Sequence, residues 1–273
     1  MLQVCAEALH EHLAFDAVRL WILDEATPAL VLRASVGAVP PNDYLVRVPI
    51  GQHKVGEIAV LRRPHITNAV QDDPTMRNRE WIREQAFVAF AGYPLIVDDQ
   101  LVGVMAMFAR HSLEPATGDA LNTVARSVAL AIQRKRAETA VSMLAAIVEG
   151  STDAIFSVTL DGLISSWNRG AERLYVYSRT EILGQPVTRL IPSADAELVN
   201  ATQRGEPVPT IETTHRARDG QPIPVALTIS SIRDNTGRIV GGSGIARDMS
   251  ERRRLEEQFR QAQKMEAIGR LAG

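Results

Sequence analysis

The alternation of apolar and polar positions in the first half of the chain predicts a sheet covered by helices. The clearest signal is a pair of apolar runs, 89–97 and 101–108, separated by the polar residues 98–100. Two β-rich runs around a short polar break predict a hairpin. Shorter elements are expected before it: helices over 4–13 and 55–60, extended pieces over 17–23, 29–36 and 64–67, and a helix or loop over 74–85.

A long helical pattern follows this hairpin. Neither Gly nor Pro interrupts residues 121–149. One apolar stripe consists of Leu121, Val124, Val128 and Ile132. Further apolar residues recur at helical or heptad spacing: Leu130, Ala137, Val141, Leu144 and Val148. We predict one continuous helix that ends near Gly150 and forms a parallel dimer seam.

The second half returns to the period of strands. Residues 154–159 and 163–167 flank Asp161-Gly162, which predicts a hairpin with a two-residue turn. Asn168 is expected to cap the next helix, and the pattern from Ser178 to Glu181 is that of a capping box. The remaining expected elements are a helix that Gly184 ends, a short helix over 194–203, and strands over 210–218, 223–233 and 238–247.

Three details within these strands carry expectations of their own. Pro222 and Pro224 lack amides on the same side of their strand, so this end should lie at a sheet edge or beyond the paired region. The glycine run 241–244 indicates a bulge or close packing rather than phosphate binding. His215 occupies an apolar slot of a strand, where a hydrogen-bonded structural role is expected.

The C-terminal stretch predicts an exit helix, and we take it as the segment on which the rest of the chain acts. Ser250 is the expected N-cap, and Asp248, at the end of the last strand, can favour the helix N-terminus. An apolar stripe with charged flanks follows: Leu255, Phe259, Ala262, Met265 and Leu271 or Ala272. A stripe this narrow needs a partner helix, so Asp248, Ser250, Leu255, Phe259 and Met265 are the candidate signal-transmission residues.

Composition narrows the classes of function. The 273 residues suggest about two domains of an α+β protein, and a net charge of −2 gives no reason to expect nucleic acid as a partner. The single cysteine, Cys5, excludes an internal disulfide, and its expected role is a small buried or half-buried hydrophobe. We expect no metal site, no catalytic residues, no membrane segment and a cytoplasmic location, because no motif or apolar run indicates otherwise.

Residues 1–136 resemble a GAF domain. The order of helix, strands, crossover, hairpin and helix fits that family, and 93–97 with 101–105 match its central hairpin. The cyclic-nucleotide signature of some GAF domains is absent. Bilin-binding members use a cysteine at a defined place, whereas Cys5 lies in the first helix, before the sheet begins, so the resemblance gives no reason to expect a bilin. The helix over 121–150 would connect this domain to the next.

Residues 151–250 resemble a PAS domain. The matching motifs occur in order: Asp153-Ala154-Ile155-Phe156, Asp161-Gly162, Trp167-Asn168-Arg169-Gly170-Ala171-Glu172, Tyr177-Ser178, Gly184, Arg218-Asp219-Gly220 and Arg247-Asp248-Met249-Ser250. The family often has Gly where Val176 stands, and the segment 192–205 is shorter than usual. The resemblance implies that flavin of the LOV type and haem are unlikely cofactors, since the cysteine and helix histidine that hold them are missing; any ligand is unknown.

Residues 251–273 resemble the start of the dimerisation helix of bacterial sensor histidine kinases, on the run Lys264-Met265-Glu266-Ala267-Ile268-Gly269-Arg270-Leu271-Ala272-Gly273. The resemblance implies a homodimeric sensing and relay region without kinase activity of its own. Its parent would phosphorylate a histidine and then a response-regulator receiver. Two alternatives stay open: a ligand-free dimerisation module, and the sensor region of another output enzyme such as a cyclic-dinucleotide synthase or phosphodiesterase.

Overall fold

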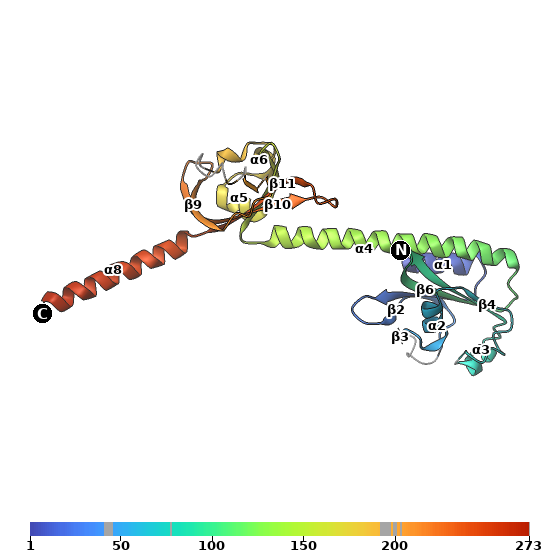
Figure 1. The fold of residues 1–273 in the computed structure, drawn as a ribbon. Helices are drawn as coiled ribbons and strands as arrows, with labels where there is room; N and C mark the ends of the chain where they lie inside the picture. Colours follow the sequence, from blue (N-terminus) through green and yellow to red (C-terminus); the bar gives the residue numbers. More distant parts are fainter. Residues whose placement is uncertain (41–45, 77, 192–197, 199–200, 203, 273) are drawn as a thin grey trace. The chain divides into compact units, whose positions relative to one another are not determined.

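The computed structural model describes the chain except residues 41–45, 77, 192–197, 199–200, 203 and 273; of residues 266–272 it gives the helical backbone. Two compact units are present, Met1–Ala140 and Val141–Gly273. The division falls inside one helix, α4 (Pro115–Gly150), which is continuous over 36 residues (Figure 1). The predicted connecting helix is therefore confirmed, and it begins six residues earlier than the sequence pattern indicated.

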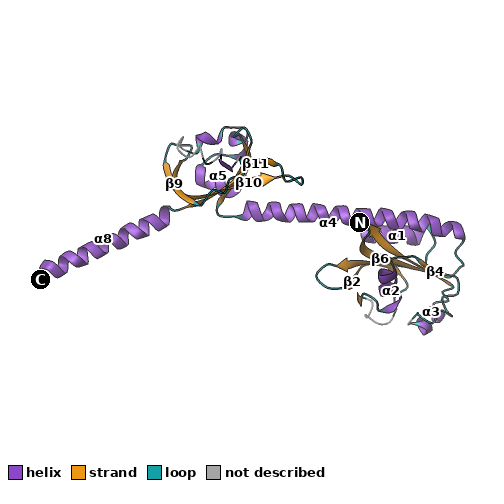
Figure 2. Cartoon of the chain, viewed as in Figure 1, coloured by secondary structure: helices purple, strands orange, loops and turns teal. Residues whose placement is uncertain are grey.

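The first unit is an antiparallel sheet of six strands in the order β3-β2-β1-β6-β5-β4. Its strands are β1 (Ala17–Asp24), β2 (Ala29–Gly37), β3 (Arg47–Pro49), β4 (His65–Thr67), β5 (Ala89–Val97) and β6 (Gln100–Ala109). Its helices are α1 (Leu2–His12), α2 (His53–Leu61), α3 (Arg79–Glu84) and the first part of α4 (Figure 2).

Both faces of this sheet are buried. Neighbouring residues of a strand point to opposite faces, and accordingly Ala91 and Tyr93 join one apolar cluster while Phe90 joins the other. The first cluster packs against α1 and α4, and the second against α2 and α3. This burial explains why β5 and β6 are continuous apolar runs rather than alternating ones.

The predicted central hairpin is confirmed, with a tighter turn than expected. Val97 pairs with Gln100, so Gln100 belongs to β6 and only Asp98 and Asp99 form the turn. Both aspartates have positive φ, 47° and 60°. Positive φ at both central residues is the conformation of a type I′ turn, whose twist matches that of the two strands.

The second unit is an antiparallel sheet of five strands in the order β8-β7-β11-β10-β9. Its strands are β7 (Ala154–Thr159), β8 (Ile164–Trp167), β9 (Ile211–Arg216), β10 (Pro222–Arg233) and β11 (Ile239–Asp248). Short helices α5 (Arg169–Tyr175) and α6 (Arg179–Ile182) and the turn η2 (Val187–Arg189) accompany it, and α8 (Ser250–Ala272) follows (Figures 1 and 2).

Only one face of the second sheet is in the core. Ala154, Phe156 and Val158 of β7 are buried, whereas the residues between them are partly exposed. The buried face packs against α5, α6 and η2. The predicted Asn168 cap and the Ser178–Glu181 capping box are both present, and Gly184, at φ 76°, follows the end of α6.

Two expectations for the second unit need correction or refinement. Val158 pairs with Ile164, and the Thr159 amide donates to the carbonyl of Leu163, the residue before β8. The loop between Thr159 and Leu163 therefore has three residues, 160–162, where the sequence predicted a two-residue turn. β10 is an interior strand, and Pro222 and Pro224 pair with Arg216 and Thr214 of β9. Pairing with β11 begins only at Val225, so the two prolines lie beyond the paired region on that side alone. The helix expected over 194–203 lies largely outside the described residues.

Among the described residues, no helix combines the length and apolar character needed to cross a membrane. Cys5 is partly buried against the first apolar cluster, as expected.

Candidate functional site

The candidate transmission site lies where β11 passes into α8. Met249, between them, is buried and donates its amide to the carbonyl of Pro224, 2.9 Å away. The helix begins at Ser250, and Oδ1 of Asp248 accepts from the Ser250 amide at 2.8 Å. A carboxylate there satisfies a first-turn donor and interacts favourably with the helix dipole. Asp248, rather than the Ser250 hydroxyl that the sequence pointed to, therefore supplies the visible cap contact.

A second contact ties the exit of this unit to its entry. Arg247 precedes Asp248 on β11, and its Nη2 lies 2.8 Å from Oδ2 of Asp153, just before β7. The Arg247 Nε also lies 3.2 and 3.3 Å from the two carboxylate oxygens. A forked contact of this kind fixes the relative orientation of both side chains. This ion pair is exposed to solvent, so it should add little to the stability of the domain. Its main effect is to fix the position of the end of β11 relative to the start of β7.

Asn168 joins the end of α4 to the sheet. Its side chain is buried and makes four hydrogen bonds: Oδ1 accepts from the amides of Ile155 and Ala171, and Nδ2 donates to the carbonyls of Val148 and Asp153, at 2.8 to 3.1 Å. Two donors and two lone pairs are all that an asparagine amide offers. The sequence predicted the cap on Ala171 but not the bond to Val148, which holds the last turn of α4.

The last turn of α4 has a further attachment. Oε2 of Glu149 accepts from the Arg169 amide at 3.1 Å, and Oε1 lies 3.3 Å from Nη1 of Arg179. Farther back, Nη1 of Arg136 lies 2.8 Å from Oε1 of Glu25 in the first unit. α4 is thus bonded to the first unit up to Arg136 and to the second unit from Val148 onward.

Between these attachments and along α8, apolar side chains are exposed. Leu121, Val128 and Ile132 are buried, whereas Val141 is 67% exposed and Leu144 is 65% exposed. On α8, Leu255, Phe259 and Met265 are 53%, 66% and 78% exposed. Of the predicted transmission residues, the structure therefore brings Asp248 and Ser250 into contact and leaves the other three on an uncovered helix surface.

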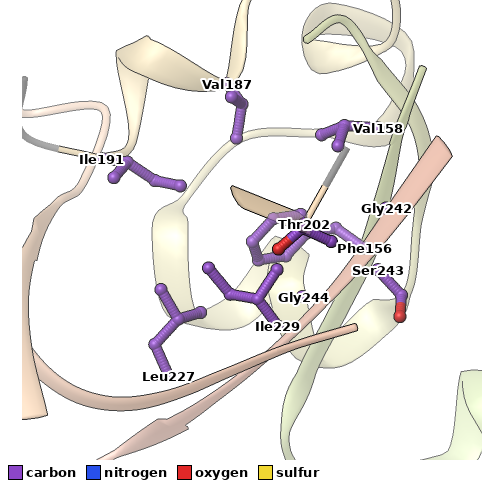
Figure 3. A pocket seen from close by; sticks show the side chains of 10 residues that line it. All are labelled: Phe156, Val158, Val187, Ile191, Thr202, Leu227, Ile229, Gly242, Ser243 and Gly244. Atoms are coloured by element: carbon purple, nitrogen blue, oxygen red, sulfur yellow. The ribbon is translucent and has the colours of Figure 1, made fainter. Parts of the chain in front are cut away.

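The core of the second unit contains a small apolar cavity of about 20 Å³ (Figure 3). Phe156, Leu227 and Ile229 contribute to its walls, together with Val158, Val187, Ile191, Thr202, Gly242, Ser243 and Gly244. A water molecule needs roughly 10–15 Å³ by this measure, so the space holds about one water. The described walls contain no charged side chain to orient a ligand.

The glycine run of β11 forms part of this wall by close packing, as the sequence predicted. A Cβ on Gly244 would lie 2.5 Å from the Phe156 ring, and one on Gly241 would lie 2.4 Å from the Val158 carbonyl oxygen. At Gly242 the nearest atoms are 3.4 Å away, an ordinary contact distance. Only two of these three glycines are therefore required by their neighbours.

His215 is a buried strand residue with a hydrogen-bond partner, as predicted. Its Nδ1 lies 2.6 Å from the hydroxyl of Tyr175, and the two rings stack at a centroid distance of 5.8 Å. Burial raises the pKa of Tyr175 above its ordinary value, so the phenol keeps its proton for this bond.

The comparisons with known families agree with this arrangement. The GAF domain family matches residues 1–132, and the PAS fold family matches residues 142–249. The chain thus consists of a GAF domain followed by a PAS domain, with two antiparallel sheets joined by a long helix.

Among individual proteins, the chain is similar to the signal transduction histidine-protein kinase AtoS of Escherichia coli (strain K12), with 24% identity over 127 residues. The match covers 46% of this chain but 21% of AtoS. The chain therefore spans about a fifth of the length of this relative.

Two solved structures are similar to the separate domains. A GAF domain of a phosphoenolpyruvate-protein phosphotransferase from Coxiella burnetii is 25% identical, with a TM-score of 0.45; the match covers 51% of this chain and 84% of that structure. A PAS domain from Colwellia psychrerythraea is 29% identical, with a TM-score of 0.37 and coverage of 41% and 98%.

Proposed function

We propose that this chain senses a signal and relays it through paired helices to the kinase core of a sensor histidine kinase. In this proposal two copies associate in parallel along the second part of α4 and along α8. A ligand or partner that prefers one arrangement of these helices shifts the population toward it. The chain itself transfers no phosphoryl group, and the parent kinase acts in the cytoplasm on a histidine and then on a receiver domain.

The observation that carries the proposal is the divided character of α4. Its first part is embedded in the core of the GAF domain, and its last turn is bonded to Asn168 at the start of the PAS domain. The segment between exposes Val141 and Leu144 at a spacing of three. Exposed apolar residues at helical spacing are the surface that a second helix covers.

The transmission residues at the PAS exit support the second half of the path. Any change in the end of β11 moves Asp248, and Asp248 is bonded to the first amide of α8. Arg247, on the same strand end, is bonded to Asp153 at the entry. The Arg247–Asp153 contact connects the exit of the PAS domain to its entry, and the Asp248–Ser250 contact connects the last strand to α8.

The test is cysteine cross-linking of the full chain in a Cys5→Ser background. Leu144→Cys should give a covalent dimer under mild oxidation, because a parallel seam brings the same residue of both copies together. Ser142→Cys is the matched control: two residues apart on a helix is about 200° around its axis, so it faces away from the seam. Equal cross-linking at both positions, or a monomer in sedimentation, would contradict the parallel seam.

The absence of kinase activity is tested separately by incubation of the purified chain with radiolabelled ATP. We expect no incorporation of label. Incorporation that survives removal of contaminating kinases would overturn the assignment of this chain as a relay without catalysis.

A further inference from the structure

A groove lies where η2 meets the free edge of the PAS sheet. Strand β9 is the last strand of that sheet, so only one of its edges pairs with another strand, β10. The groove has a volume of about 600 Å³, and its described walls include Thr188, Arg189, Thr214 and Arg216. It is far larger than the cavity of about 20 Å³ inside the same domain. A space of this size accommodates several residues of an extended peptide.

The register of β9 shows which of its backbone groups face the free edge. The amide of Ala217 donates toward β10, to the carbonyl of Gln221, whereas the amide of Arg216 donates away from β10, to the carbonyl of Leu190 at 3.0 Å. Backbone groups alternate between the two sides of an antiparallel strand, so the amide and carbonyl of Thr214 point the same way as those of Arg216. No described residue bonds to the backbone of Thr214 on that side. The edge of β9 therefore offers a donor and an acceptor to an added strand.

Two arginines give this groove a positive charge. Arg189 in η2 and Arg216 on β9 both line it and are exposed. Within the described part of the chain, neither side chain has an ion-pair or hydrogen-bond partner, whereas Arg218 nearby is paired with Glu181 at 2.7 Å. None of the described lining residues is Asp or Glu. Because a guanidinium matches the two oxygens of a carboxylate, the groove favours an acidic occupant.

A groove of about 450 Å³ in the GAF domain lacks this combination. It lies beside β5 and α4, and charges of both signs line it: Arg62 and Arg126 with Asp98 and Asp99. Pro94 of β5, which also lines it, has no amide to pair with an added strand. Positive charge and available backbone groups thus occur together at β9 and not at this second groove.

We infer that the free edge of β9 binds an extended acidic segment of a partner protein, which adds a strand to the PAS sheet. The backbone of Thr214 pairs with the added strand, and carboxylates of the segment bind Arg189 and Arg216. Main-chain pairing supplies affinity in complexes of this kind, and side-chain contacts supply specificity. Docking at β9 is separate from the dimer seam proposed on α4 and α8, so it can fail while the relay holds, and the relay can fail while the segment binds.

The probe is a fluorescently labelled hexapeptide in which valine and glutamate alternate, titrated into the full chain and followed by fluorescence anisotropy. Valine favours the extended conformation, and glutamate supplies the carboxylates. We expect this peptide to bind saturably. The same peptide with glutamine in place of every glutamate should bind at least about tenfold more weakly, because it cannot form the charge-assisted bonds. A third peptide keeps the glutamates but is N-methylated at every backbone amide, and it should also bind at least about tenfold more weakly, because it cannot pair as a strand.

Variants identify the site. Arg189→Gln and Arg216→Gln should each weaken binding of the glutamate peptide by about threefold to tenfold. Arg238→Gln is the matched control, because Arg238 is an exposed arginine beyond the opposite end of β10 and should leave binding unchanged.

The backbone of the edge is tested at Thr214. Thr214→Pro removes the amide that faces the free edge but no bond to β10, and proline is tolerated at such edge positions. It should weaken binding by about tenfold or more, whereas Thr214→Ala keeps the amide and should have little effect. If Thr214→Pro fails to fold by circular dichroism, the two arginine variants and the N-methylated peptide decide the question.

Four outcomes would overturn the inference. A glutamate peptide that never saturates would show that the edge binds no such segment. Equal affinity for the glutamate and glutamine peptides would remove the acidic class of partner. Full binding of the N-methylated peptide, with displacement by free glutamate, would make the groove a site for small anions without strand addition. Binding that is unchanged in Arg189→Gln and Arg216→Gln would place the peptide elsewhere on the chain.

Discussion

The GAF and PAS domains of this chain treat their buried polar groups differently. In the PAS domain, Asn168 uses all four of its hydrogen-bonding positions on the protein, and the residues around the cavity are apolar or small. In the GAF domain, Arg19, Lys54 and Asn78 line a cavity of about 60 Å³, and the amide of Asn78 has no acceptor among the described residues. Asn168 therefore specifies the local structure through its bonds to the protein, whereas the buried Nδ2 of Asn78 makes no such bond to a described residue.

The stability of the two domains should depend on different interactions. A sheet buried on both faces leaves the GAF domain a large core in which one charged cavity is tolerated. The PAS sheet is buried on one face, so its stability depends more on the bonds that join α4, β7 and α5. The predictions below test this contrast, from the largest expected effect to the smallest.

Removal of the two asparagine side chains should have very unequal effects on stability. Asn168→Ala removes the acceptor of the Ile155 and Ala171 amides and the donor to the Val148 and Asp153 carbonyls, and should lower the free energy of unfolding of the PAS domain by about 3 kcal/mol. Asn78→Ala deletes a buried donor that makes no bond to a described residue and should change stability by less than about 0.5 kcal/mol. Urea titration with peptide-resolved hydrogen exchange measures each domain separately; comparable losses in both variants would contradict the contrast.

Acid should weaken the GAF domain first. Burial raises the pKa of Asp73, but hydrogen bonds from Thr75 and His65 and the charge of Lys54 outweigh it and lower the pKa to about 2. A folded pKa below the unfolded value of about 3.9 gives stability that is present above pH 4 and is lost as the pH falls toward 2, in total roughly 2 kcal/mol.

Asp73→Asn is the control for this acid effect: it should lower stability at neutral pH and flatten the acid limb of the GAF domain. In the PAS domain the raised pKa of Tyr175 has the opposite sign. The contribution of Tyr175 to the stability of the PAS domain is present at neutral pH and is lost as the pH rises beyond the usual range of tyrosine pKa values. Thermal unfolding across pH, followed by hydrogen exchange, would refute the assignment if the PAS domain were the more acid-sensitive of the two.

Two glycines of β11 give a measure of how tightly the PAS cavity is packed. Gly244→Ala places a methyl group 2.5 Å from the Phe156 ring, and the displaced ring should cost about 1.5 kcal/mol of stability. Gly242→Ala, with its nearest neighbours at 3.4 Å, is the matched control and should cost less. Equal stabilities in chemical denaturation would show that the Phe156 ring moves freely into the cavity.

The smallest expected effect concerns two helix ends with left-handed backbone. Val176 ends α5 at φ 61° and its side chain is largely exposed, so Val176→Gly should raise stability by about 0.5–1 kcal/mol by relief of strain. Arg62 ends α2 at φ 51°, but its Nη1 donates to the Asp99 carbonyl at 2.9 Å. Arg62→Gly should therefore bring no gain, and a gain from it comparable to that of Val176→Gly would argue against this explanation.

Much of the fold was predictable because its signals are local. The hairpin of β5 and β6, the unbroken α4, the Asn168 cap and the Ser178–Glu181 capping box each depend on residues a few positions apart. The errors were also local: the turn at Asp98-Asp99 is shorter by one residue and the β7–β8 loop longer by one than the polar residues indicated. Such boundaries follow from strand register, which the pattern of side chains leaves uncertain by one residue.

The sequence by itself determined two β-sheet domains, the long helix between them and the exit helix, because hydrophobic period, caps and turn residues act between near neighbours. Only the tertiary structure decided which side chains meet across long separations. Asp153 and Arg247 are 94 positions apart, and Arg19 reaches Trp81 only because the strand and α3 pack on the same face of the sheet. The two cavities belong to this second group, since the volume and charge of an interior space depend on packing between elements that no single stretch of sequence contains.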